Sequence, residues 1–75
     1  LEMNLGKQHG LNPSEIVGVI AKRAEIPGRS IGKISIFLEH SFVDVPEEMV
    51  PQVLARTRDV RIRRMPMNLQ VVGQN

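Results

Sequence analysis

An α+β domain, in which a four-stranded antiparallel sheet carries two helices on one face, is the fold class that the sequence predicts. Three observations predict it. Apolar residues alternate with polar ones in five short segments, two other segments place apolar residues at helical spacing, and proline stands near the start of each helical segment. The predicted order is strand, helix, strand, strand, helix, strand. We expect one domain over residues 1–75, with a folded part from about residue 3 to residue 73.

The first strand and the first helix follow from the N-terminal third of the chain. Met3 and Leu5 alternate with polar residues, which is typical of a half-buried strand. Asn12 is a suitable N-cap and Pro13 suits the first helical position. The helix should therefore begin there, and it should end before the Ile-Pro-Gly segment at 26–28.

The middle of the chain predicts a β-hairpin. In IGKISIFLEHSFVDVP, apolar and polar residues alternate on both sides of residues 39–40. Pairing the two strands around that point sets Ile36 opposite Val43 and Phe37 opposite Phe42. The aliphatic side chains then share one face of the sheet, and both phenylalanines lie on the other.

The C-terminal third predicts the second helix and the remaining strands. A helix should run from about residue 50 to residue 57, with Pro51 at an early position. Alternation at 60–63 indicates a short edge strand, and Met65-Pro66 is expected to turn the chain into a last strand at 69–71. Residues 73–75 are expected to form a tail.

Charge is distributed unevenly along this chain of net charge +2. Residues 56–64 hold five arginines and one acid, Asp59, whereas the other 66 residues hold five basic and seven acidic groups. A basic patch on a mildly acidic body suits a polyanionic partner, although a solvated surface segment is the plain alternative. The absence of cysteine and of long apolar runs predicts a soluble, cytoplasmic fragment that has no contact with a membrane.

The open face of the predicted sheet is one candidate site. The RNA-recognition motif (RRM) stacks unpaired bases on aromatic side chains of such a face, and Phe37 and Phe42 fall on it here. The alternative is that the two rings only pair with each other and stabilise the sheet. Asn4 stands where the first strand of an RRM usually carries an aromatic residue.

The arginines are the stronger candidate. Arg61 and Arg63 should project together from the edge strand and Arg64 should extend that patch, with only Asp59 as a nearby acid in the sequence. Guanidinium groups bind phosphates in a bidentate manner, so we expect phosphate contacts from them. The helix dipole is the alternative explanation for Arg58 and its neighbour Arg56. The predicted RNA-binding residues are Arg58, Arg61, Arg63, Arg64, Phe37, Phe42, Lys7, Lys22 and Arg23.

Catalytic chemistry finds no support in the sequence. We predict no catalytic residue, no metal ligand and no cofactor, because His9 and His40 belong to no ligand cluster and no phosphate-binding glycine loop occurs. Glu47 and Glu48 fit the charge expected at a helix start. We attribute Gly18, in the middle of the first helix, to close packing against the sheet in preference to a close approach by RNA.

Two stretches, SEIVGVIAKRAEIPGRSIGKISIFLEHSFVDVP and RTRDVRIRRMPMNLQVVG, resemble the C-terminal RNA-binding domain of bacterial DEAD-box RNA helicases of the DbpA and DeaD (cold-shock) group. The resemblance implies an RRM-like (ferredoxin-like) βαββαβ fold. It also implies an auxiliary domain that tethers an ATP-dependent helicase core to structured RNA, with roles in ribosome assembly, RNA decay and cold adaptation. The loop GKQHG has only Lys7 and His9 where some relatives are rich in lysine.

The partners implied by this resemblance are structured RNA, including ribosomal RNA, and the helicase core of the parent chain. A second copy of the full-length protein, in a homodimer, is a further candidate partner. The fragment itself is expected to lack enzymatic activity because the motifs of the helicase core are absent from it. The alternative function is a protein-interaction or dimerisation module that uses the open sheet face.

Overall fold

The computed structural model of the chain describes residues 1–72. Its strands are β1 (Glu2–Met3), β2 (Ile34–Ile36), β3 (Ser41–Val43), β4 (Arg61–Ile62), β5 (Met65–Pro66) and β6 (Leu69–Gln70). Its α-helices are α1 (Pro13–Ala24) and α2 (Val50–Arg56), and its short 3₁₀ turns are η1 (Lys7–His9), η2 (Gly28–Ser30) and η3 (Glu47–Met49). The tail expected at residues 73–75 lies outside the described residues.

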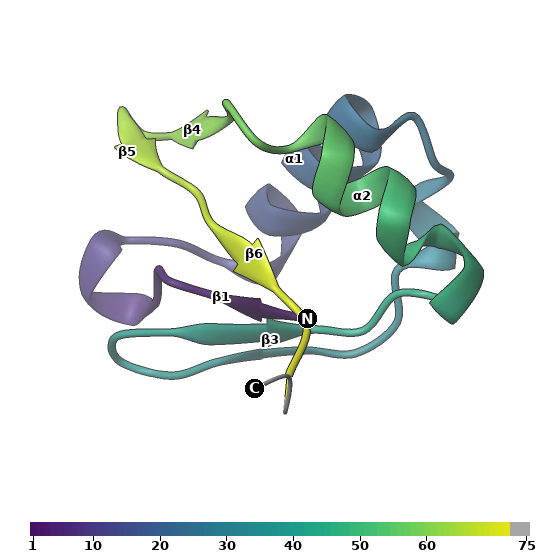
Figure 1. Cartoon of the computed structure of the whole chain (residues 1–75). Coiled ribbons are helices and arrows are strands. Elements are labelled where there is room, and N and C mark those ends of the chain that lie inside the picture. The colour runs from purple at the N-terminus through teal and green to yellow at the C-terminus, as the bar shows by residue number, and fades with distance from the viewer. Residues whose placement is uncertain (73–75) are drawn as a thin grey trace.

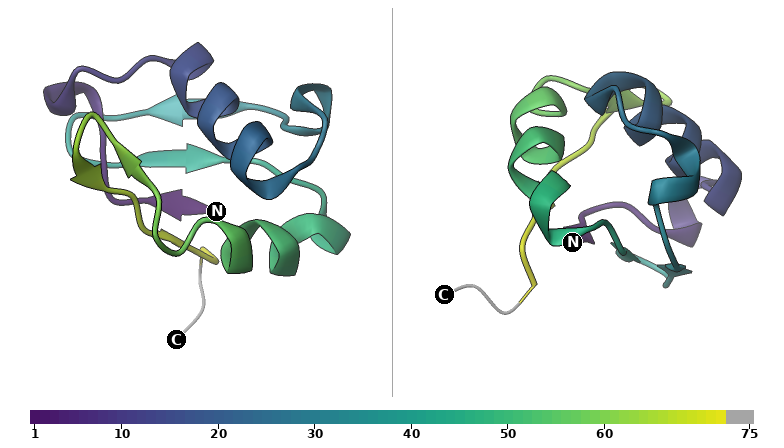
Figure 2. Two further views of the ribbon diagram at one scale, coloured as in Figure 1. Left: turned by 90° about the horizontal axis from the view of Figure 1, so that it is seen from above. Right: turned by 90° about the vertical axis from the view of Figure 1, so that its right-hand side faces the viewer.

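Four strands form one antiparallel sheet in the order β2-β3-β1-β6, and β4 and β5 form a separate two-stranded sheet. Both helices lie over the same face of the larger sheet (Figures 1 and 2). The predicted α+β class, with two helices and a four-stranded antiparallel sheet, is confirmed. No helix within residues 1–72 is long and apolar enough to cross a membrane.

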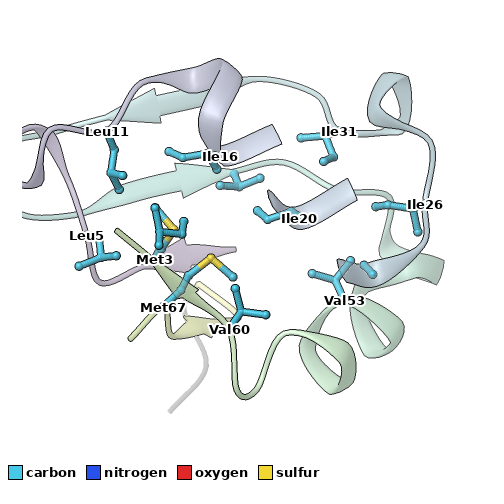
Figure 3. Packing of buried hydrophobic residues seen from close by; sticks show 13 residues of the cluster. Met3, Leu5, Leu11, Ile16, Ile20, Ile26, Ile31, Val53, Val60 and Met67 are labelled. Carbon is cyan, nitrogen blue, oxygen red and sulfur yellow. The ribbon is translucent and has the colours of Figure 1, made fainter. Parts of the chain in front are cut away.

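The hydrophobic core fills the space between the sheet and the helices (Figure 3). Met3 from β1, Val43 from β3, Ile16 and Ile20 from α1, and Val53 from α2 are all fully buried. The segments that connect the regular elements complete the core with Leu5, Leu11, Ile26, Ile31, Val60 and Met67. A chain of this size buries a modest share of its surface, so these connecting segments matter for stability.

The helices begin and end where the sequence predicts. The Asn12 side chain accepts a hydrogen bond of 2.9 Å from the backbone N–H of Glu15, with Pro13 as the first residue of α1. Helix α1 ends at Ala24 and is capped by Glu25, whose φ of 59° is the left-handed conformation that commonly closes a helix. Helix α2 follows η3 directly and ends at Arg56, close to the predicted residue 57.

The register of the β2–β3 hairpin differs from the predicted one by two residues. Ile36 pairs with Ser41 rather than with Val43, because the turn is closed by a hydrogen bond of 2.8 Å from the Phe37 N–H to the His40 carbonyl. The two-residue connection is therefore 38–39 in place of 39–40, and each β2 residue pairs with a β3 residue two positions earlier than expected. Since side chains alternate with a period of two, an even shift keeps every residue on its predicted face.

The segment 60–66 differs more from its prediction. Strand β4 pairs with β5 and not with the edge of the main sheet, and Met65-Pro66 is a strand rather than a turn. The turn is made by Arg63 and Arg64, with φ values of 52° and 71°. Two-residue hairpin turns with both residues at positive φ usually carry Asn-Gly, so a pair of arginines gives no turn signal in the sequence.

Two glycines show opposite environments. A Cβ on Gly6 would meet the Phe37 carbonyl and would lie 2.7 Å from both the Leu38 carbonyl oxygen and the His40 nitrogen. No atom would lie within 4 Å of a Cβ on Gly18. The attribution of Gly18 to close helix–sheet packing is therefore wrong, because its position in α1 faces away from the sheet.

These environments predict opposite effects of alanine on stability. Gly6→Ala should lower the free energy of unfolding by about 1–3 kcal/mol, because rigid backbone surrounds the new methyl group. Gly18→Ala, the matched control, should raise it by about 0.5–1 kcal/mol through helix propensity. Chemical denaturation of the two variants measures both effects, and a Gly6→Ala protein as stable as Gly18→Ala would contradict the close approach at Gly6.

Candidate nucleic-acid interface

Three turns that are distant in sequence lie close together at one end of the molecule: η1, the β2–β3 turn and the turn of the β4–β5 hairpin. Figure 1 shows η1, drawn in purple, between the β4–β5 hairpin and the turn that links β2 to β3. The N–H groups of Lys7 and Gln8 donate hydrogen bonds of 2.8 and 3.0 Å to the carbonyls of Phe37 and Leu38. Lys7 is thus held beside the β2–β3 turn by its own backbone.

Three aromatic rings pack together on the open face of the sheet beside this end. Phe37 stacks on His40 with ring centroids 5.1 Å apart, and Phe42 meets both rings edge to face at 5.7 and 5.3 Å. Phe37 is nevertheless 49% exposed, which leaves ring surface available to a ligand. Sequence patterns did not predict His40 in this group, because a histidine two residues before Phe42 shares its face only if the strand alternation extends into the turn.

Asn4 has a structural role on the same face. Its Nδ2 donates to the Pro66 carbonyl at 3.0 Å, and its Oδ1 accepts from the Asn68 N–H at 2.7 Å. The side chain thus joins β1 to the segment between β5 and β6, since Asn68 directly precedes β6. This explains why an amide stands here in place of a stacking aromatic residue.

Arg58 and Arg61 face one surface hollow of about 330 Å³, which Asp59, Val60 and Pro66 also line. Both arginines are exposed, and neither has an ion-pair partner within residues 1–72. Two guanidinium groups beside one acid leave a net positive charge at this hollow. Such an arrangement suits a phosphate group, which accepts paired N–H donors from arginine.

Arg63 is held by an acidic residue that the sequence places 48 positions away. Its Nε donates to Glu15 Oε2 at 2.9 Å. This hydrogen bond, followed by charge attraction, raises the pKa of Arg63 above its ordinary value. Asp59 is the only acid near these arginines in the sequence, but the fold brings Glu15 on α1 to the hairpin.

Arg64 is exposed beside Arg63 at the tip of the β4–β5 hairpin, and no ion pair within residues 1–72 includes it. Its left-handed backbone is strained for a residue with a Cβ atom. Strain of this kind concentrates at functional sites, where the side chain matters more than local stability. Arg61, Arg63 and Arg64 do not project from one strand as predicted, since the last two form the turn.

The other predicted basic residues belong to different parts of the surface. Lys22 and Arg23 are exposed in the last turn of α1. Arg56 donates to Glu25 at 2.9 Å and so connects the ends of the two helices. Within residues 1–72, no group of three or more histidine, aspartate or glutamate side chains could hold a metal ion.

Comparison with known proteins adds an independent line of argument. A family model described as the DbpA RNA binding domain matches residues 1–71. The chain is 37% identical to the ATP-dependent RNA helicase DeaD of Escherichia coli K12 over 71 residues. These residues make up 95% of this chain and 11% of that protein. It is also 30% identical to DeaD of Buchnera aphidicola from Acyrthosiphon pisum over 70 residues. These residues make up 93% of this chain and 12% of that protein. The chain thus spans about a ninth of the length of these relatives.

The ion pair between Glu15 and Arg63 predicts the local stability of the β4–β5 hairpin. Glu15→Gln removes the charge that holds Arg63, so the amide hydrogens of Ile62 and Met65 should exchange with solvent faster. Exchange measured by NMR tests this. The matched control is Glu25→Gln, which removes the acid of the Arg56 pair and should leave the hairpin amides unchanged. Equal hairpin exchange in wild type and Glu15→Gln would show that the pair does not hold the hairpin.

Proposed function

The chain belongs to the DbpA RNA-binding domain family, and from this premise we propose that it is a non-catalytic RNA-binding domain of an ATP-dependent RNA helicase. The observation that carries the proposal is the set of exposed arginines without ion-pair partners among residues 1–72, two of which face one hollow. We also propose that the chain is a single RRM-like βαββαβ domain with the β4–β5 hairpin inserted before its last strand. The strand order β2-β3-β1-β6 supports this topology.

Phosphate binding is assigned to Arg58, Arg61 and Arg64. Their guanidinium groups provide bidentate donors to phosphate oxygens and keep their charge at every physiological pH. Arg63 has a different role, because its Nε is already engaged by Glu15. It positions the hairpin tip so that Arg64 faces the ligand.

Base binding is assigned to the aromatic group of Phe37, His40 and Phe42, with Lys7 at its border. Unpaired bases stack on such rings, and each stacked base contributes roughly 1–3 kcal/mol. The backbone hydrogen bonds of the η1 turn keep Lys7 near the rings. Lys22 and Arg23 lie on α1 and provide a weaker, longer-range attraction to RNA.

In the parent protein, this domain would anchor the helicase core to structured RNA, ribosomal RNA included. Tethering raises the effective concentration of the core at its RNA, which needs no catalytic group in the domain itself. Ribosome assembly, RNA decay and cold adaptation in the cytoplasm are the processes in which such an anchored helicase would act. The relatives are ATP-dependent RNA helicases by name, which supports the assignment of the parent activity.

The salt dependence of RNA binding tests the arginine assignment. A variant with Arg58→Ala, Arg61→Ala and Arg64→Gly should bind an RNA hairpin more weakly, and the slope of log affinity against log salt should fall by roughly 0.7–0.9 for each lost phosphate contact. Glycine is chosen at residue 64 because it relieves the left-handed strain and keeps the turn folded. Fluorescence anisotropy titrations at several salt concentrations give both quantities.

Arg56→Ala is the matched control for that experiment. It removes the same charge from a residue that pairs with Glu25, so the salt slope should stay close to that of wild type. If the triple variant and wild type showed the same affinity and the same slope, the assignment of these arginines would be wrong. The triple variant loses three charges and Arg56→Ala loses one. If the slope fell by the same amount per lost charge in both variants, RNA affinity would depend on net charge and not on these positions.

The second candidate function is a protein-interaction or dimerisation module. Phe37 and Leu38 favour it, since they are 49% and 63% exposed at the β2–β3 turn. Sedimentation of the chain at several concentrations, with and without RNA, separates the two functions. The RNA-binding function predicts a monomer in the absence of RNA, whereas a stable dimer without RNA that Phe37→Ala dissociates would favour the second candidate.

A further inference from the structure

A polar hollow lies on the open face of the main sheet, apart from the arginines. It has a volume of about 180 Å³ and is lined by Glu2, Asn4, Asn68, Leu69 and Gln70. These residues come from β1, from β6 and from the positions next to them. One carboxylate and three side-chain amides therefore line one hollow.

Glu2 is the central residue of this hollow. In the sheet register it stands directly between Phe42 on β3 and Gln70 on β6. Its side chain is half-buried, and within residues 1–72 neither a hydrogen bond nor an ion pair engages its carboxylate. Asn4 differs, because both ends of its amide already bond to Pro66 and Asn68.

A carboxylate at the centre of an RNA-binding face repels phosphate, and hydrogen-bond donors of a bound base would offset that repulsion. An ionised carboxylate only accepts hydrogen bonds, and two parallel N–H donors match its two oxygens. Among the four standard bases, guanine alone has two adjacent N–H donors on its Watson–Crick edge, at N1 and at the 2-amino group. Adenine, cytosine and uracil each present a single donor site there.

We propose that this hollow binds an unpaired guanine of the RNA. The Glu2 carboxylate accepts hydrogen bonds from the N1–H and the 2-amino group, and the Gln70 amide is placed to donate to the guanine O6. Phe42, directly opposite Glu2 on the same face, offers its ring to the base. The inference rests on the proposed RNA-binding function and adds a base preference to it.

The test uses RNA hairpins that differ at one unpaired base. The loop is five uridines in which the central base is left as uracil or replaced by guanine, inosine or adenine, and inosine keeps the N1–H but lacks the 2-amino group. Wild type should bind the guanine loop at least about fivefold more tightly than the adenine loop, with inosine between them, because a good bidentate base contact discriminates by that factor or more.

The variant Glu2→Gln separates a base contact from simple charge repulsion. Glutamine turns an N–H₂ donor toward the donors of guanine, so affinity for the guanine loop should fall at least about fivefold. Affinity for the uridine loop should stay equal or rise, because a negative charge is lost. Glu48→Gln is the matched control: Glu48 is exposed in η3, outside the hollow, and the variant should keep the preference for guanine.

Equal binding of the four loops by wild type would overturn the guanine site, and so would a Glu2→Gln variant that binds all loops more tightly by one factor. Equal binding is also the result expected if the sheet face serves a protein partner. In each of these cases the salt slope of the arginine variants still reports whether the chain binds RNA, so the two proposals fail separately. Thermal unfolding of each variant confirms that it is folded.

Discussion

The contact between Gly6 and the β2–β3 turn is the constraint on which much of the molecule depends. The chain leaves β1 so close to this turn that a side chain at residue 6 would meet three backbone atoms of residues 37–40. The hydrogen bonds of Lys7 and Gln8 and the Ser41 hydroxyl, which donates to the Leu5 carbonyl at 2.7 Å, hold the two segments together. This contact sets the position of η1, the conformation of the turn and the packing of the aromatic rings beside it.

The five arginines of segment 56–64 have different roles because of where the fold places them. Arg56 and Arg63 each pair with an acid on α1 or at its end, and they tie the C-terminal half of the chain to that helix. Arg58 and Arg61 share a hollow, and Arg64 stands at the tip of a strained turn. A dense run of like charges in the sequence is thus divided into structural ion pairs and exposed groups that a polyanion can reach.

The open sheet face and the arginine surface offer two different kinds of chemistry. The arginines supply charge, which gives affinity for any RNA but carries no information about its bases. The sheet face supplies aromatic rings, amides and one carboxylate, groups that recognise the faces and edges of unpaired bases. A domain that anchors a larger enzyme benefits from both, since charge speeds the encounter and base contacts select the site.

The sequence by itself determined the α+β class, both helices with their proline starts and the face on which each residue of the β2–β3 hairpin lies, because these follow from local periodicity and capping. The same local pattern misplaced the register of the hairpin by two residues and assigned 60–63 to the edge of the main sheet. Only the tertiary structure decided these features, along with the Glu15–Arg63 pair, the Asn4 bridge and the hollow at Glu2. The pair, the bridge and the hollow join groups that lie 48 to 68 positions apart, and the β4–β5 hairpin depends on a left-handed turn at two arginines. Local sequence rules do not describe such contacts.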